Sequence, residues 1–139
     1  MRAIFLDTHV VVWLFGGFDK KLPDMTKALI EANELYISPI VILEIQYLKE
    51  IGRINFPAKE IINDLRGKIG LLVDDLPFES ATQKATEISW TRDPFDRLIA
   101  SQVILRGYPL ITKDNHILAN LPLAVWDTPK SITHVEAKV

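Results

Sequence analysis

Short apolar runs alternate along the chain with longer stretches in which apolar residues recur at helical spacing. The short runs predict strands at 3–6, 35–38, 71–73, 110–112 and 124–126. The longer stretches predict helices at 8–15, 23–32, 40–51, 57–65, 77–89 and 93–106. Strands that alternate with helices in this way favour an α/β fold, a three-layer sandwich in which helices flank a central, mostly parallel sheet of about five strands.

Start and stop signals support the two helices that matter most for the later argument. Ser38 and Pro39 precede one helix, and Gly52 follows it. Asp93 and Pro94 begin the clearest helix of the chain, which runs to Arg106 before a glycine. There is no repeat or linker, so we expect one domain over residues 1–130 and a loose C-terminal tail over 131–139.

Composition changes this picture in four ways. Hydrophobic residues make up 48% of the 139 residues, which predicts a sheet buried on both faces or an apolar surface kept for a partner. The absence of cysteine excludes disulfides and thiolate chemistry. No apolar run approaches the roughly 18 residues of a membrane span, so we expect a soluble, cytoplasmic protein with no membrane association. The net charge of −2 predicts no strong field, so any nucleic-acid binding would depend on local basic residues and bound metal.

Four acidic residues, Asp7, Glu44, Asp96 and Asp114, are positioned so that turns can bring their side chains together. Asp7 and Asp114 follow predicted strands, and ligands of open parallel sheets bind outside the carboxyl ends of the strands. Carboxylates suit a hard divalent cation, and a cluster of them is unfavourable without one. The four residues together therefore predict a metal site.

Each acid also has a simpler explanation. Asp7 and Asp93 could be helix N-caps, with Asp96 as the acid of a capping box behind Asp93. Glu44 could be an exposed helix residue, although its apolar neighbours make its burial costly without a positive partner. Asp114 could open a turn. One shared site explains all four acids better than four unrelated roles.

Other catalytic chemistries find little support. The sequence has no Gly-x-Ser-x-Gly elbow and no Gly-rich phosphate loop. The three histidines lack metal-ligand spacing, and only His116, two residues after Asp114, remains a candidate for contacting substrate. The three tryptophans are scattered, which favours a core or interface role over a base-stacking platform.

The order and spacing of these residues resemble PIN-domain ribonucleases, and most closely the VapC toxins of bacterial and archaeal toxin–antitoxin pairs. The resemblance spans nearly the whole chain, through Leu6-Asp7-Thr8-His9, Glu44, Asp93-Pro94-Phe95-Asp96-Arg97 and Thr112-Lys113-Asp114. It implies a PIN-like fold, a metal-dependent endoribonuclease that leaves a 5′-phosphate, a cognate antitoxin and a homodimer. The run around Glu44 departs from the family pattern, which bears on substrate preference.

The resemblance also assigns roles to individual residues. Asp7, Glu44, Asp96 and Asp114 would hold one or two Mg²⁺ or Mn²⁺ ions, with Asp93 as direct or second-layer support. Thr112 could offer its hydroxyl to the site. Arg97, Lys113 and Arg92 are the candidate phosphate contacts, and Arg97 could instead pair with a site carboxylate.

Two other functions remain open at this stage. A PIN-like scaffold could have lost catalysis and only bind a partner, but no site acid is missing. An aspartate phosphotransfer protein could use Asp7 as phospho-acceptor. One such class needs a second acid two residues further on, where this chain has His9, and a receiver domain gives Glu44 no role.

Overall fold

A parallel sheet forms the middle layer of the computed structural model, which describes residues 2–17 and 19–127. Its strands are β1 (Ala3–Leu6), β2 (Glu34–Ile37), β3 (Leu72–Val73), β4 (Leu110–Ile111) and β5 (Ala124–Val125). The helices are α1 (Thr8–Gly16), α2 (Asp24–Ala32), α3 (Pro39–Glu50), α4 (Ala58–Ile69), α5 (Phe78–Ala85), α6 (Pro94–Arg106) and α7 (Asn115–Asn120). A 3-10 turn, Asp19–Lys21, precedes α2. The predicted α/β sandwich of about five strands is confirmed, and all four strand pairs are parallel.

The strand order, β3-β2-β1-β4-β5, places the first strand in the centre of the sheet. From β1 the chain builds outward through β2 to β3, and it then returns to the other side of β1 with β4. The order of connection therefore reverses between β1 and β4. At such a point, open parallel sheets bind ligands in a crevice outside the carboxyl ends of the strands. The register pairs Leu6 with Ile111 at this end.

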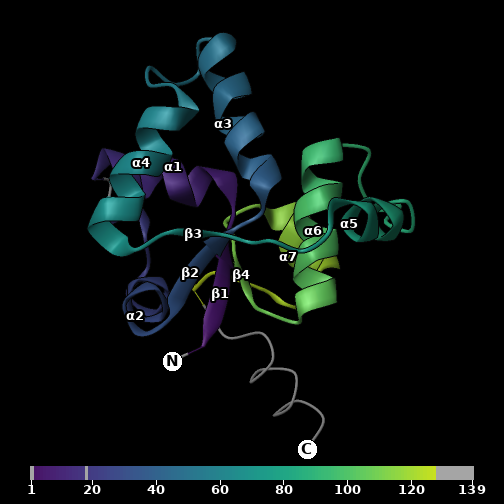
Figure 1. Cartoon of the computed structure of the whole chain (residues 1–139). Coiled ribbons are helices and arrows are strands. Elements are labelled where there is room, and N and C mark those ends of the chain that lie inside the picture. The colour runs from purple at the N-terminus through teal and green to yellow at the C-terminus, as the bar shows by residue number, and fades with distance from the viewer. Residues whose placement is uncertain (1, 18, 128–139) are drawn as a thin grey trace, which may run out of the picture.

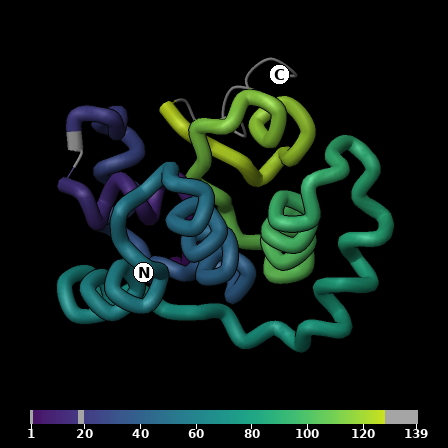
Figure 2. Tube along the Cα trace, turned by 90° about the horizontal axis from the view of Figure 1, so that it is seen from above, coloured from purple at the N-terminus to yellow at the C-terminus, as the bar shows by residue number. Residues whose placement is uncertain are grey.

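Helices cover both faces of the sheet. Figures 1 and 2 show α1, α2 and α4 on one side and α5 and α6 on the other, while α3 rises beyond the carboxyl ends of the strands. α3 packs against α4 on one side and α6 on the other. This helix therefore links the two outer layers at the end of the sheet where we expect the functional site.

The central strands are buried on both faces, as their continuous apolar sequence predicts. Phe5, Leu6, Leu110 and Ile111 have at most 1% of their surface exposed. They form one core with apolar side chains of the surrounding helices, such as Ile99 of α6. Burial of this kind stabilises by roughly 25 cal/mol per Å² of apolar surface, which fixes the strand ends and hence the polar residues that follow them.

The helix boundaries differ from the predictions in three places. The predicted helix 77–89 ends at Ala85, because the chain turns there and buries Ile88. The predicted helix 57–65 continues to Ile69 and ends at Gly70, whose φ of 67° suits glycine. Helix α7 was not predicted, since six residues are too few to show a helical period.

Two further observations bear on the sequence predictions. In the described part of the chain, no helix is long and apolar enough to cross a membrane. The predicted tail, 131–139, lies outside the described residues.

Candidate metal centre

Asp7 lies at the point where the order of connection in the sheet reverses. It follows β1 directly and caps α1, so the turn from strand to helix places its carboxylate at the carboxyl end of the central strand. Its two oxygens accept hydrogen bonds from the Thr8 backbone N–H at 2.8 Å and from the Thr112 hydroxyl at 2.6 Å. Thr112 follows β4, and its hydroxyl thus joins the two strands beside the crevice.

Burial determines the acidity of this carboxyl group. Asp7 is only 7% exposed, and loss of hydration raises its pKa. The hydrogen bonds from Thr112 and Thr8 act in the opposite direction because they stabilise the carboxylate. Asp7 is therefore a buried acid whose ionised form depends on donors already in place and on any further positive charge.

Helix α3 brings Glu44 to the same crevice. The Thr8 hydroxyl donates a hydrogen bond to one of the Glu44 carboxylate oxygens, which fixes the side chain over the start of α1. Burial, and secondarily the neighbouring Asp7, Asp93 and Asp114, raise the pKa of Glu44 to about 7. At neutral pH this group is poised between its two protonation states.

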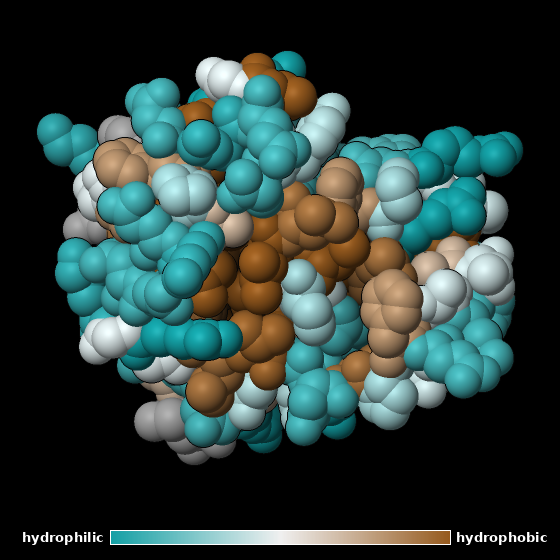
Figure 3. All heavy atoms as spheres, turned by 45° about the horizontal axis from the view of Figure 1, so that its top comes forward, coloured by the Kyte–Doolittle hydropathy of each residue, from teal (hydrophilic) through white to brown (hydrophobic). Residues whose placement is uncertain are grey.

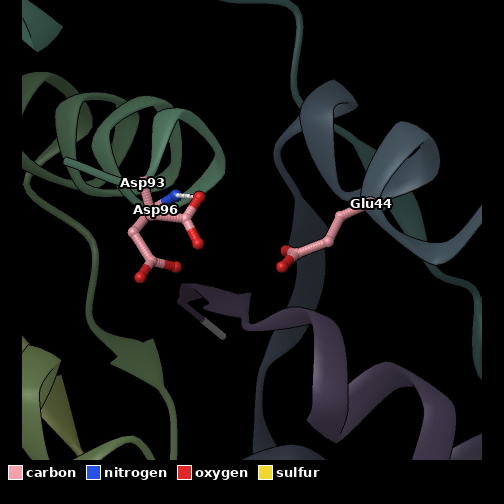
Figure 4. A group of neighbouring side chains, drawn as sticks. All are labelled: Glu44, Asp93 and Asp96. Atoms are coloured by element: carbon pink, nitrogen blue, oxygen red, sulfur yellow. Dashed lines mark hydrogen bonds between the residues drawn. The ribbon is translucent and has the colours of Figure 1, made fainter. Parts of the chain in front are cut away.

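Asp93 and Asp96 reach the crevice from the opposite side, at the start of α6. Asp93 is the N-cap of α6 and accepts from the backbone N–H groups of Phe95 and Asp96. Burial, followed by the charge of Asp93, raises the pKa of Asp96 to about 8. Figure 4 shows Asp93 and Asp96 facing Glu44 across the crevice, with β1 and α1 below.

Three of these acids are close enough to share one ion. Glu44, Asp93 and Asp96 each offer an oxygen, and the three oxygens lie within 4.8 Å of one another. The sequence indicates two roles for Asp93, an N-cap or support for a metal, and Asp93 is both a cap and a member of this closest group.

Asp7 and Asp114 complete an acidic cluster of five residues around this group. Asp114 is exposed and caps α7, and its charge contributes to the raised pKa values of Asp7, Glu44 and Asp96. The strand β4 ends at Ile111, so Asp114 belongs to the turn into α7 rather than to the strand. All five acids named from the sequence thus lie within electrostatic range, although only three form the closest group.

The candidate substrate contacts have diverse surroundings. The Arg97 guanidinium donates through Nε to the Thr91 carbonyl at 2.8 Å, and among the described residues it forms no ion pair with a site carboxylate. A ring nitrogen of His116 contacts the Trp90 carbonyl, so this histidine holds the chain before α6. Arg92 and Lys113 are exposed and can reach a ligand.

Thr8 is a site residue that the sequence reasoning missed. Its side chain is fully buried, and the hydroxyl links α1 to Glu44, 36 positions further along. A threonine directly after Asp7 at a helix start was the only available signal, and it gave no indication of the partner.

A buried polar network that the sequence did not reveal also ties the two halves of the site together. The Ser38 hydroxyl, which caps α3, donates to the Gln102 side chain of α6. Gln102 in turn donates to Asp74 at 2.9 Å, and Arg106 donates to the same carboxylate at 3.0 Å. These bonds fix the start of α3 against α6, the two helices that carry Glu44 and Asp96.

Comparisons with known proteins agree with this architecture. Residues 4–122 match the PIN domain family. The chain is 30% identical over 131 residues to Ribonuclease VapC22 of Mycobacterium tuberculosis, which covers 91% of this chain and all of that protein.

Solved structures share the fold. One is VapBC2 from Rickettsia felis bound to a DNA fragment from its promoter, with a TM-score of 0.61, 20% identity and coverage of 90% of this chain and 99% of that chain. Another is a toxin–antitoxin complex from Klebsiella pneumoniae, with a TM-score of 0.62, 18% identity and coverage of 91% and 97%.

Proposed function

The chain belongs to the PIN-domain family, and from that premise we propose that it is a metal-dependent endoribonuclease, the toxin of a type II toxin–antitoxin pair. The observation that carries the proposal is the group formed by Glu44, Asp93 and Asp96, with oxygens within 4.8 Å of one another beside the buried Asp7. The ribonuclease relative and the shared fold of toxin–antitoxin proteins support the same activity. We place its action in the cytoplasm.

The donor set fits Mg²⁺ or Mn²⁺. All the donors are carboxylate oxygens, which these hard cations prefer, and the cluster contains no cysteine or histidine ligand. Glu44, Asp93 and Asp96 would hold the ion, with Asp7 and Asp114 beside them. Burial and the neighbouring carboxylates raise the pKa of Glu44 to about 7 and that of Asp96 to about 8, so a bound cation would stabilise the ionised form of both groups.

The protein's own groups would orient the reaction. The hydroxyls of Thr8 and Thr112 hold Glu44 and Asp7 in place, so the carboxylates need little reorganisation on binding. When bound, the ion would lower the pKa of a water molecule and neutralise charge on the phosphate under attack. Arg92 and Lys113 are exposed cations that would hold the RNA backbone. The products would carry a 5′-phosphate and a 3′-hydroxyl.

We further propose that the protein forms a homodimer through α3. Leu43, Tyr47 and Ile51 follow one another at a spacing of four residues, and each is 47–57% exposed. Tyr47 also contacts the Phe95 ring of α6, with centroids 5.9 Å apart. Figure 3 shows hydrophobic residues in the middle of this side of the molecule, with hydrophilic surface to the left and right of them. Ultracentrifugation should give a dimer, and Tyr47→Lys should give a monomer.

An antitoxin would bind to a different surface of the protein. A hollow of about 390 Å³ beside α1 and α4 is lined by Phe15, Phe56 and Ile61, among others. The Phe15 and Phe56 rings meet edge to face, and Phe56 is 44% exposed. An amphipathic helix of a partner would bury such a surface.

The central experiment is cleavage of labelled single-stranded RNA by the purified protein with Mn²⁺ or with EDTA. We expect cleavage only with Mn²⁺, and at least ~10²-fold less from Asp96→Asn. Asp24→Asn is the matched control, because Asp24 also lies in the first turn of a helix but is not among the charges that raise the pKa of Glu44 or Asp96. An inactive binding scaffold would leave the RNA intact under every condition.

A further inference from the structure

A second pocket lies beside the acidic cluster, between α1 and the segment after α3. It encloses about 320 Å³, and its polar lining comes from His9, Trp13, Lys21 and Arg53. Val12 and Leu48 are among its apolar lining residues. Pockets that bind small molecules begin at about 300 Å³, so this one can hold a single nucleoside. We refer to it as the Trp13 pocket.

Cations surround the indole ring of Trp13. The ammonium groups of Lys21 and Lys113 lie 5.3 Å and 5.8 Å from the ring centroid. The ring is half-buried and packs on Trp126, with centroids 6.0 Å apart, which holds its orientation. A fixed aromatic surface among basic side chains is the combination with which proteins bind single-stranded nucleic acid.

The pocket adjoins the acidic cluster through two continuous segments. Trp13 follows Asp7 by six residues on α1, a rise of about 9 Å along the helix. Lys113 is the immediate neighbour of Asp114, so the turn after β4 presents a carboxylate at the cluster and a cation above Trp13. A nucleotide next to the scissile phosphate can therefore reach the pocket.

Charge favours RNA over a protein segment in this pocket. The adjacent crevice is acidic and offers no basic side chain among Glu44, Asp93 and Asp96, so RNA needs positive charge on the approach. Lys21, Arg53 and Lys113 supply it around Trp13. Arg53 also lines the neighbouring hollow, where the side chains of Phe15 and Phe56 offer apolar surface to a partner helix.

We propose that the Trp13 pocket binds a nucleotide of the RNA substrate adjacent to the scissile phosphate. The base stacks on Trp13 and displaces one ammonium group, because stacking of a base on an aromatic ring is stronger than an exposed cation–π contact. The displaced lysine and Arg53 then contact phosphates on either side. This inference rests on the proposed ribonuclease function and assigns a substrate subsite to it.

The test measures RNA binding without cleavage. A fluorescein-labelled single-stranded RNA of mixed sequence is titrated with the Asp96→Asn protein in Mg²⁺, and its anisotropy gives the dissociation constant. Adding Trp13→Ala should weaken binding at least about 10-fold, while Trp13→Tyr should retain most of the affinity because the ring remains.

Variants of exposed basic residues test the same pocket without the risk that loss of the Trp13 ring disturbs the fold. Lys113→Gln and Arg53→Gln replace exposed side chains, and each should lower the slope of log affinity against log salt by about 0.7. The matched control is Lys84→Gln on α5, which packs against α6 away from α1. It should leave both the affinity and the slope unchanged.

The outcomes separate this inference from the proposed function. If the unaltered protein cleaves RNA and the Trp13 and Lys113 variants bind RNA normally, the proposed subsite is wrong and the proposed ribonuclease function stands. If the protein does not cleave RNA but binds it in a way that depends on Trp13, the proposed ribonuclease function is wrong and the Trp13 pocket still binds a nucleotide. If the variants bind RNA normally but no longer bind a co-expressed antitoxin, the pocket serves the protein partner and the inference fails.

Discussion

Replacing Asp96 by Asn should stabilise the metal-free protein at neutral pH. The substitution replaces one acid in the cluster of five by a neutral amide of nearly the same shape. In the folded protein the pKa of Asp96 is raised from 3.8 to about 8, chiefly by burial and then by Asp93. Folding at pH 7 therefore requires this group to take up a proton that it does not carry in the unfolded chain.

The size of the effect follows from that difference in pKa. Without screening, the uptake of this proton would cost about 4 kcal/mol of folding free energy at pH 7. Asp96 is only half-buried, and solvent screens its charge, so we expect about 1–2 kcal/mol. For a chain of this size that corresponds to a melting temperature roughly 4–8 °C higher for Asp96→Asn.

The pH dependence gives the sign of the effect a separate check. An acid whose folded pKa is raised favours the fold below its unfolded pKa, and the advantage is lost as pH rises through the folded pKa. The metal-free protein should therefore lose stability between about pH 4 and pH 8. The gain from Asp96→Asn should be smaller at pH 5 than at pH 7.

The assay is thermal unfolding in EDTA and in millimolar Mn²⁺. Mn²⁺ should stabilise the parent by about 2.7 kcal/mol at a hundred times its dissociation constant, and Asp96→Asn much less. The control Asp24→Asn should lower the melting temperature slightly in both media, since it only loses a favourable charge at a helix start. If Asp96→Asn melts below the parent in EDTA and Mn²⁺ does not stabilise the parent, the acids are surface charges and not a metal site.

Three other predictions concern the same crevice. Asp7→Asn should slow RNA cleavage by about 10²-fold in saturating Mn²⁺, and Asp93→Asn should cost less because Asn remains a good N-cap; equal rates for parent and Asp7→Asn would exclude Asp7. Thr112→Val should weaken Mn²⁺ binding about 10-fold by calorimetry, since Asp7 loses a donor, whereas Thr112→Ser should not. Mn²⁺ binding should tighten from pH 6 to pH 8 with release of protons, as Glu44 and Asp96 have pKa values of about 7 and about 8; a pH-independent affinity would contradict those values.

The central strand and the positions of Asp7 and Asp93 could be predicted because the relevant signals are local. A continuous apolar run predicted β1, and a polar residue directly after a strand can only lie at the strand end. The start of α6 was equally clear from Asp93 and Pro94. In each case a few neighbouring residues determine the conformation.

The distance between Glu44 and Asp96 could not be predicted from the sequence, because it depends on how α3 and α6 pack. That packing rests on a buried chain of hydrogen bonds from Ser38 through Gln102 to Asp74, residues 64 and 28 positions apart. A buried polar group must find a partner, but composition and periodicity do not say which one. The same reason hid the contact between Thr8 and Glu44.

Capping a helix and binding a metal are compatible roles for an aspartate, because a carboxylate has two oxygens. Asp93 and Asp114 each cap a helix with Oδ1 alone, and Oδ2 accepts no hydrogen bond from the described residues. Capping therefore orients the second oxygen rather than consuming the carboxylate. Asn keeps an oxygen for the cap but replaces the other by an NH₂ group, which repels a cation. Substitution by Asn at Asp93 and Asp114 should thus preserve α6 and α7 while weakening any metal that they help to bind.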